Sequence, residues 1–298
     1  MRTLLISLAL LATLTVTHAK VGRQAILQSG DAPIIIALGD IPTPEAYQTA
    51  IDDYMVFVRA RLETVVMNLK ALSTALENND LQSAKKYYLS AHYAYETIRP
   101  IILVFGNMDR MINSPASAYL LQENDPNFKG FHAVEYALFH QHNMHDALRE
   151  NQRLLKYLRD LVKRAEIETL FLPKLVQSAP DFAEHILENK LSGRDHYYSG
   201  ADLSEINANL EGITAILTVL KPHLDDAFVA SVEENIHAIR QQLLPYDQAG
   251  TYLPLDQLTQ TDRQHLYGLT SQLAETLAQL RGLLAIEVYH SFDSKEMP

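Results

Sequence analysis

Two side chains that could bind a metal ion lie one helical turn apart in an apolar stretch. The sequence "NFKGFHAVEYALFH" places His132 three residues before Glu135. Side chains at this spacing share one face of a helix, so the imidazole and the carboxylate can converge on one ion. A neutral imidazole with carboxylates suits first-row divalent metals. A histidine that pairs with a carboxylate without binding an ion gives the same pattern. The spacing alone favours this structural alternative.

A second segment, "YYLSAHYAYETIRP", carries Tyr88, His92 and Glu96 at intervals of four residues. This interval places the three side chains on one helix face. An amphipathic helix with buried tyrosines, in which Glu96 pairs with Arg99, explains the same pattern. The segment therefore predicts either ligands or a structural ion pair.

Other segments carry weaker signals. The segment "FGNMDRMI" supplies Asp109, which is either a loop carboxylate or a helix cap. The turn-rich segment "LSGRDHYYSGADL" offers Asp195, His196, Tyr198 and Asp202, and the default role of Asp202 is that of an N-cap. The segment "FHQHNMHDAL" contains His140, His142 and His145. Because these histidines fall where one helix should pass to the next, an exposed turn is favoured over a metal site.

Several classes of function are excluded by what the chain lacks. It has no cysteine, so thiolate ligands and cysteine nucleophiles are excluded. Its net charge of −11 argues against binding nucleic acid through a general basic field. GxSxG, Walker-type and HExxH motifs are absent, and the reverse pattern HxxEH fails because Tyr136 follows Glu135.

The first 19 residues have the pattern of a secretory signal peptide. Arg2 precedes an apolar run over residues 4–16, and Ala19 ends a short segment suited to cleavage. No later segment has eighteen unbroken apolar residues, which a membrane-spanning helix would need. The sequence predicts cleavable export and a periplasmic or otherwise extracytoplasmic location.

The remaining chain predicts an all-α protein, because its apolar residues recur at helical spacing. Thr43 and Pro44 are the expected start of a long first helix, and the only β-like run covers residues 32–39. Later helices are expected at residues 80–99, 146–172, 180–190, 203–220, 226–244 and 261–288. Such helices suit antiparallel bundles, so we expect an N-terminal bundle over residues 20–172 and a C-terminal bundle over residues 173–298.

Five segments occur in an order that resembles the imelysin-like family, over residues 42–286. They are "YAYETIRPI", "FGNMD", "DPNFKGFHAVEYALF", "NKLSGRDHYYSGADLSEINANLEGI" and "YLPLDQLTQTDRQHL". The resemblance implies two antiparallel four-helix bundles packed side by side, with a metal site in the cleft between them. It is strongest for the periplasmic iron-uptake members, in a short form without an N-terminal cupredoxin domain.

By this resemblance, the metal ligands are Glu96, Asp109, His132 and Glu135. Three carboxylates and one imidazole suit iron, with zinc and manganese as alternatives. The implied function is binding ferrous or ferric iron and passing it to an inner-membrane permease. Three positions depart from the pattern of the iron-uptake members: Arg99 replaces a glutamate, Asn113 an aspartate and Gly200 a histidine. Each change removes a potential ligand, so the affinity should be lower or the site repurposed.

Two other classes of function stay open from the sequence. The family is named for a proposed peptidase activity, but Glu135 cannot readily be both a metal ligand and a general base. A module that binds an acidic or neutral polysaccharide would use tyrosine rings and the cations Arg99, Lys190 and Arg194. A non-enzymatic metal-binding role is the leading hypothesis.

Overall fold

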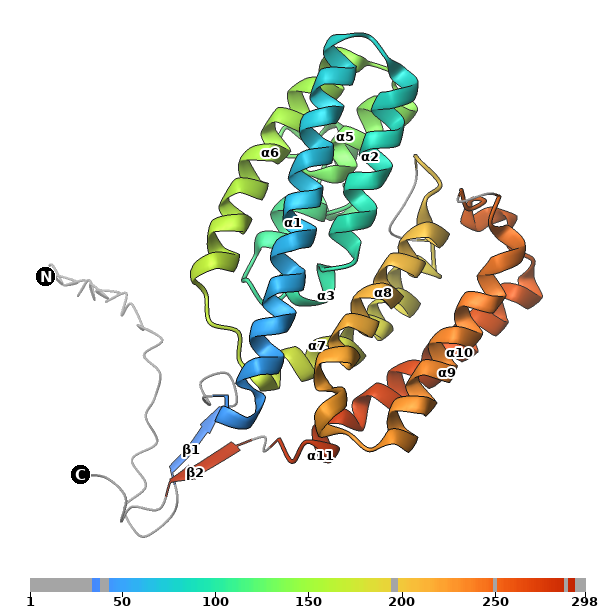
Figure 1. The fold of residues 1–298 in the computed structure, drawn as a ribbon. Helices are drawn as coiled ribbons and strands as arrows, with labels where there is room; N and C mark the ends of the chain where they lie inside the picture. Colours follow the sequence, from blue (N-terminus) through green and yellow to red (C-terminus); the bar gives the residue numbers. More distant parts are fainter. Residues whose placement is uncertain (1–33, 38–42, 194–197, 249–250, 287–288, 293–298) are drawn as a thin grey trace, which may run out of the picture. The chain divides into compact units, whose positions relative to one another are not determined.

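The computed structural model describes residues 34–37, 43–193, 198–248, 251–286 and 289–292 (Figure 1). The predicted signal peptide lies outside the described residues. Residues 36–290 form one compact unit. The short strands β1 (Ile34–Ala37) and β2 (Tyr289–Phe292) pair in a two-stranded sheet, and β1 falls within the predicted β-like run.

One group of helices comes from the first half of the chain. It contains α1 (Gln48–Glu77), α2 (Leu81–Glu96), α5 (Phe131–Glu135) and α6 (Met144–Ile167). Helix α1 packs against α2 and α6, and α5 packs against α6 (Figure 1). The Asp80 side chain caps α2 by accepting a hydrogen bond from the Ser83 amide.

A second group of helices comes from the other half. It contains α7 (Leu172–His185), α8 (Asp202–Leu220), α9 (Asp226–Leu243), α10 (Gln260–Ala278) and α11 (Leu280–Leu283). Helix α10 packs against α7 and α9, while α8 contacts both α7 and α9. Helix α8 also packs against α1 and α2 of the first group, so residues distant in sequence meet between α2 and α8.

Short helical segments connect the longer ones. Helices α3 (Arg99–Ile102) and α4 (Met108–Asn113) follow α2, and π-helical turns extend α5 over Tyr136–His140 and α7 over Ile186–Lys190. The 3-10 turns are Glu45–Tyr47, Ala116–Ala118, Gln122–Asn124, Lys221–His223, Leu244–Tyr246 and Leu255–Gln257.

The structure confirms the all-α fold class and corrects several boundaries. Thr43 does not cap the first helix, because its hydroxyl accepts a hydrogen bond from the Leu172 amide at the start of α7. The helix expected at residues 180–190 begins at Leu172, with Pro180 inside it. A proline removes one backbone donor but need not end a helix that is buried on one face. The division into bundles over residues 20–172 and 173–298 stays a prediction.

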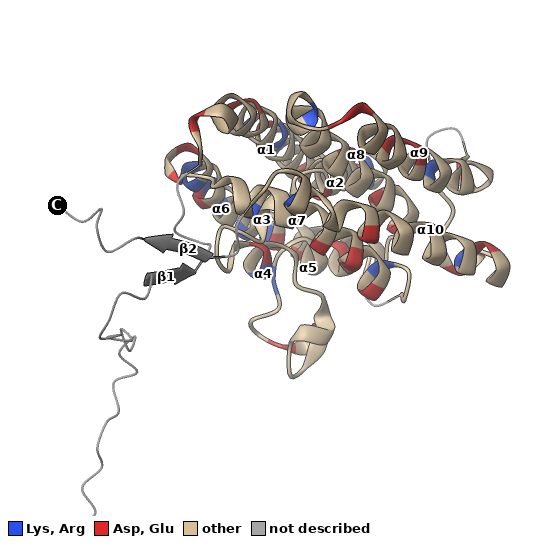
Figure 2. Ribbon diagram, turned by 90° about the horizontal axis from the view of Figure 1, so that it is seen from below, with Lys and Arg blue, Asp and Glu red and all other residues tan. Residues whose placement is uncertain are grey.

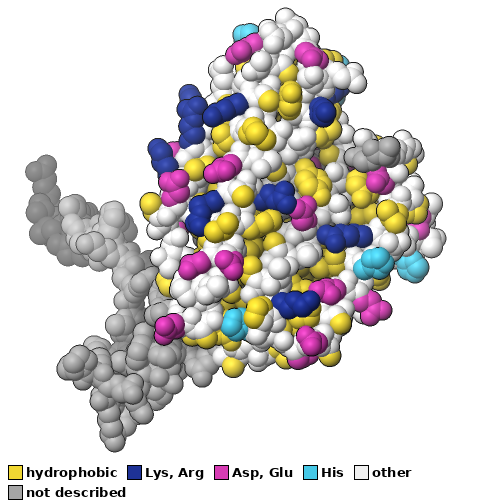
Figure 3. All heavy atoms as spheres, in the orientation of Figure 1, with side chains coloured by type: hydrophobic (Ala, Val, Ile, Leu, Met, Phe, Trp, Pro, Cys, Tyr) yellow, Lys and Arg dark blue, Asp and Glu magenta, His cyan; other side chains and the backbone are white. Residues whose placement is uncertain are grey.

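Charged residues of both signs are distributed along the helices. Acidic and basic positions are both scattered along the ribbon in Figure 2, and the face in Figure 3 shows charged side chains of both signs among hydrophobic ones. The net charge of −11 is therefore spread over many elements. None of the helices in the described part of the chain is long and apolar enough to cross a membrane.

Candidate metal-binding site

Glu96, the last residue of α2, is a buried carboxylate with polar contacts on both of its oxygens. Its Oε1 accepts hydrogen bonds from Arg99 Nη1 at 3.0 Å and Asn113 Nδ2 at 2.9 Å. Its Oε2 accepts one from Asn209 Nδ2 at 2.7 Å and lies 3.2 Å from Lys190 Nζ. Burial raises the pKa of Glu96, but the charges of Arg99 and Lys190 outweigh it and lower the pKa to about 2. Glu96 is therefore a carboxylate at neutral pH.

His92 and Glu205 join Glu96 in a buried group that could hold a metal ion. His92 Nδ1 lies 2.9 Å from Glu205 Oε1, and His92 Nε2 lies 3.6 Å from Glu96 Oε1. One potential ligand atom from each of the three residues lies within 4.8 Å of the other two. Lys190 Nζ also contacts Glu205 Oε2, at 3.0 Å. We call His92, Glu96 and Glu205 the His–Glu–Glu group.

The predicted HxxE pair forms in α5, and both residues are buried. His132 Nδ1 lies 3.0 Å from Glu135 Oε2. The other carboxylate oxygen, Oε1, accepts hydrogen bonds from the Ser199 amide at 2.9 Å and the Ser199 hydroxyl at 2.5 Å. The rings of His132 and His92 meet edge to face, with centroids 5.9 Å apart. The pair therefore adjoins the His–Glu–Glu group through the two histidines.

Tyr88 lies close enough to the carboxylates of both the pair and the His–Glu–Glu group for their charges to act on its hydroxyl. Its ring contacts the His92 ring, and its hydroxyl donates a hydrogen bond to the Phe131 carbonyl at 3.3 Å. Burial raises the pKa of Tyr88 well above its usual value, and the negative charges of Glu135, Glu205 and Glu96 raise it further. We call the pair, the His–Glu–Glu group and Asp109 together the polar layer.

Asp109 lies inside α4, not in a loop or at a cap. Its Oδ1 accepts hydrogen bonds from the Tyr95 hydroxyl at 2.9 Å and Arg99 Nε at 3.1 Å. Arg99 therefore links Asp109 to Glu96, which confirms the predicted pairing of Glu96 with Arg99. Of the four residues predicted as ligands, two are in direct contact and two are joined through Arg99. Their convergence on a single ion stays a prediction.

Two glycines allow the elements of the polar layer to approach closely. Gly130 precedes α5 with φ of +84°, and a Cβ there would lie 2.2 Å from the Ile112 carbonyl oxygen of α4. Gly212 in α8 faces the chain after α2, where a Cβ would lie 2.2 Å from the Thr97 carbonyl oxygen. A side chain at either position would move α5 or α8 away from Glu96.

A pocket of about 110 Å³ reaches the polar layer from the surface. Glu205 and Ser199 line it together with Tyr93 and Tyr252. Gly200, where the family pattern has a histidine, also lines this pocket. Glu205 is therefore the member of the His–Glu–Glu group that lines this pocket.

The remaining sequence candidates lie elsewhere. His140, His142 and His145 are exposed, as expected of a turn. Asp202 is the first residue of α8, and Ala201 occupies the cap position, so the predicted N-cap role of Asp202 is wrong. Tyr198 donates a hydrogen bond to Glu123. Arg194, Asp195 and His196 lie outside the described residues.

The sequence did not point to Glu205, Lys190 or Asn209 as parts of the site. His92 and Glu96 were recognised as sharing a helix face, but Glu205 lies 113 residues after His92 and on another helix. Only its four-residue spacing to Asn209, on one face of a helix, could have drawn attention to it. The partners that complete the site therefore come from tertiary packing of α8 on α2.

Residues 50–169 match the family model Peptidase_M75, described as imelysin. This range contains all four predicted ligands, whereas Lys190 and Glu205 lie beyond it. The match to the imelysin model therefore covers the helices from α1 to α6.

The chain is similar to named components of iron uptake systems. It is 29% identical to iron uptake system component EfeM of Pseudomonas syringae pv. syringae (strain B728a), covering 91% of this chain and 99% of that protein. It is 34% identical to iron uptake system component EfeO of Escherichia coli (strain K12), covering 80% of this chain. The EfeO of Shigella flexneri gives the same values. The chain spans 64% of the length of these EfeO proteins.

Proposed function

We propose that this protein binds iron outside the cytoplasm and delivers it to a membrane permease of an iron uptake system. The observation that carries the proposal is the buried His–Glu–Glu group, in which one potential ligand atom from each of His92, Glu96 and Glu205 lies within 4.8 Å of the others. The pair of His132 and Glu135 adjoins this group through the two histidine rings. Such a set of imidazoles and carboxylates suits a metal cation. Similarity to EfeM and EfeO supports iron as that cation.

The donor atoms of the polar layer fit iron. Two imidazoles and four carboxylates offer nitrogen and oxygen ligands, which iron, manganese and zinc accept. The His–Glu–Glu group and the set Glu96, Asp109, His132 and Glu135 are alternative ligand sets, and Glu96 belongs to both. We propose that the ion binds beside Glu96 and that His92 or His132 supplies nitrogen.

Lys190 makes binding reversible. Its ammonium lies 3.2 Å from Glu96 Oε2 and 3.0 Å from Glu205 Oε2, so an ion that ligates these oxygens displaces it. When the ion leaves, Lys190 returns and restores the buried ion pairs. A site that competes with an internal cation binds less tightly than a vacant one, which suits a protein that must release its cargo.

Anaerobic calorimetry with Fe²⁺ tests the proposal. The wild-type protein should bind one ion, and His92→Ala or His132→Ala should weaken binding by at least about tenfold. His145→Ala is the matched control, because this histidine is exposed in the first turn of α6. No binding by the wild type, or equal binding by all four proteins, contradicts the proposal. Weakening by only one of the first two variants identifies the nitrogen ligand.

The proposal also includes export of the protein and a non-enzymatic role. Fractionation of cells that produce the full chain should place the protein in the extracytoplasmic fraction and shortened by about 19 residues. Similarity to iron uptake components favours a non-enzymatic role over the peptidase named in the family model. Chelator-sensitive cleavage of unfolded casein by the purified protein would contradict this part.

The polysaccharide alternative has no support from the comparisons. Two of its three proposed cations, Arg99 and Lys190, are buried and form ion pairs with Glu96, Asp109 and Glu205. They are therefore not available to the carboxylates of an acidic sugar polymer. We do not carry this function further.

A further inference from the structure

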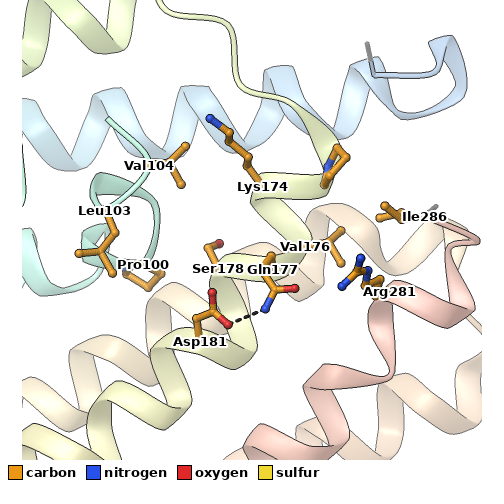
Figure 4. A pocket seen from close by; sticks show the side chains of 11 residues that line it. Pro100, Leu103, Val104, Lys174, Val176, Gln177, Ser178, Asp181, Arg281 and Ile286 are labelled. Atoms are coloured by element: carbon orange, nitrogen blue, oxygen red, sulfur yellow. Dashed lines mark hydrogen bonds between the residues drawn. The ribbon is translucent and has the colours of Figure 1, made fainter. Parts of the chain in front are cut away.

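A second pocket, lined by residues of α3, α7 and α11, has a different chemistry. It has a volume of about 330 Å³ and is lined by Pro100, Leu103 and Val104 on one side and by α7 and Arg281 on the other (Figure 4). None of its lining residues belongs to the polar layer. Small-molecule pockets typically begin at roughly 300 Å³, so the volume suits a compact ligand.

The walls of this pocket are mainly apolar. Pro100, Leu103, Val104, Pro173, Val176 and Ile286 supply hydrocarbon surface. Two polar groups on α7 are already engaged, because Gln177 Nε2 donates to Asp181 Oδ1 at 2.5 Å and the Ser178 hydroxyl donates to the Leu175 carbonyl at 2.7 Å (Figure 4). The walls therefore favour a hydrocarbon body over a polar one.

Arg281 is the exception in this apolar surface. Its Nη2 is buried and has no hydrogen-bond partner among the described residues. Figure 4 shows the Arg281 side chain extending from α11 toward α7, beside Val176. A guanidinium keeps its charge in proteins, so a buried donor without an acceptor carries a desolvation cost. An anionic oxygen in the pocket would remove that cost.

Lys174 adds a second positive charge at the same pocket. It is exposed and forms no ion pair within the described parts of the chain. Asp181 is the acidic residue that lines the pocket, and its Oδ1 accepts the bond from Gln177. The two cations therefore outnumber the one carboxylate, and the pocket is complementary to a ligand with a single negative charge.

We propose that this pocket binds a medium-chain monocarboxylate. The carboxylate accepts a hydrogen bond from Arg281 Nη2, as carboxylates do in charge-assisted pairs with arginine. The alkyl chain lies against Pro100, Val104 and Val176, where burial of apolar surface drives binding. This site is independent of the proposed iron site.

Calorimetry with decanoate, kept below its micelle-forming concentration, tests the proposal. The wild-type protein should bind one decanoate, and Arg281→Met should weaken binding at least about tenfold, because it keeps much of the side-chain volume but removes the charge. Arg159→Met is the matched control, since Arg159 is exposed on α6. Decanol should bind at least about tenfold more weakly than decanoate, because it lacks the charge that Arg281 recognises.

A tryptophan reporter gives a second readout. The chain contains no tryptophan, and Leu103 is 45% exposed at the edge of the pocket, so Leu103→Trp introduces one fluorophore there. Decanoate should shift its emission, and adding Arg281→Met should abolish the shift at the same concentration. Arg281→Met should leave Tm unchanged or raise it, because the guanidinium makes no hydrogen bond through Nη2.

Three results would overturn the proposal. The first is no binding of decanoate to the wild-type protein. The second is equal affinity of wild type and Arg281→Met. The third is decanol binding as tightly as decanoate, which would show that the pocket binds a hydrocarbon chain without recognising a negative charge.

Discussion

The His132–Glu135 pair and the His–Glu–Glu group use the same two kinds of side chain but are assembled differently. The pair lies within one turn of α5, and Glu135 is held by the amide and hydroxyl of Ser199. The group combines α2 with α8, and its carboxylates contact the cation Lys190. The pair is therefore a local motif that receives hydrogen bonds from Ser199, whereas the group is a tertiary arrangement that contains a buried cation.

The pair and the group should therefore differ in how much they contribute to the stability of the fold. The carboxylates of the group form ion pairs even without a metal, so replacing them should lower the free energy of unfolding. Glu135 in the pair keeps its position through hydrogen bonds from Ser199, so changes there should affect the site with less effect on folding. The predictions below test this contrast in order of expected size.

The largest effect is expected from Glu96→Gln. The substitution leaves Arg99 and Lys190 buried with one carboxylate fewer, and breaking a buried ion pair typically costs about 3 kcal/mol or more. Urea unfolding should show that loss. Glu77→Gln, at the exposed end of α1, is the control and should change stability by less than about 0.5 kcal/mol. Similar losses of unfolding free energy in the two variants would show that Glu96 contributes no more to stability than an exposed carboxylate does.

The contribution of Glu96 should depend on pH. Its pKa is lowered from 4.5 to about 2 in the folded protein, so its ionised form stabilises the fold above about pH 4.5. That stabilisation is lost as the pH falls through about 2. The difference in unfolding free energy between wild type and Glu96→Gln should therefore shrink from about pH 4.5 downward. A difference that stays constant from about pH 6 to about pH 2.5 would contradict the lowered pKa.

A smaller loss is expected from Gly212→Ala. The new methyl group would lie 2.2 Å from the Thr97 carbonyl oxygen, so α8 must shift away from α2. Such overpacking costs about 2 kcal/mol and should also weaken Fe²⁺ binding through Glu205. Gly268→Ala in α10 is the matched control, because a Cβ there meets nothing within 4 Å. That variant should gain about 0.5–1 kcal/mol, and a loss in both would show that helix packing is not the cause.

The smallest effect on stability is expected from Ser199→Ala. It removes the hydroxyl that donates to Glu135 Oε1 but keeps the amide donor, so the cost should be about 1 kcal/mol. Ser204→Ala is the control in the same pocket, since its hydroxyl forms no hydrogen bond within the described residues. Thermal unfolding of both variants measures the difference. A loss as large as that of Glu96→Gln would show that the pair is as important for folding as the group.

Local patterns were sufficient for part of this site. The three-residue spacing predicted the contact of His132 with Glu135, and the four-residue spacing predicted the shared face of His92 and Glu96. Both depend only on helix geometry, which the sequence period reveals. The spacing of Glu96 and Arg99 likewise predicted their ion pair.

Tertiary contacts account for what the sequence could not show. Glu205 and Lys190 reach Glu96 because α8 and the π-helical turn after α7 pack near the end of α2, and no local pattern encodes that approach. The predicted start of this helix at Pro180 is wrong, because Pro180 lies inside α7, which begins at Leu172. Helix ends and long-range partners depend on packing, whereas apolar periodicity does not.

Anomalous X-ray scattering from a crystal soaked anaerobically with Fe²⁺ tests the central claim most directly. The account predicts one strong peak at the iron edge in the polar layer, about 2 Å from a carboxylate oxygen of Glu96, with His92 or His132 as the nitrogen ligand. Lys190 should have moved away from Glu96 in that crystal. A peak at the exposed His140–His145 turn, with none beside Glu96, would contradict the account.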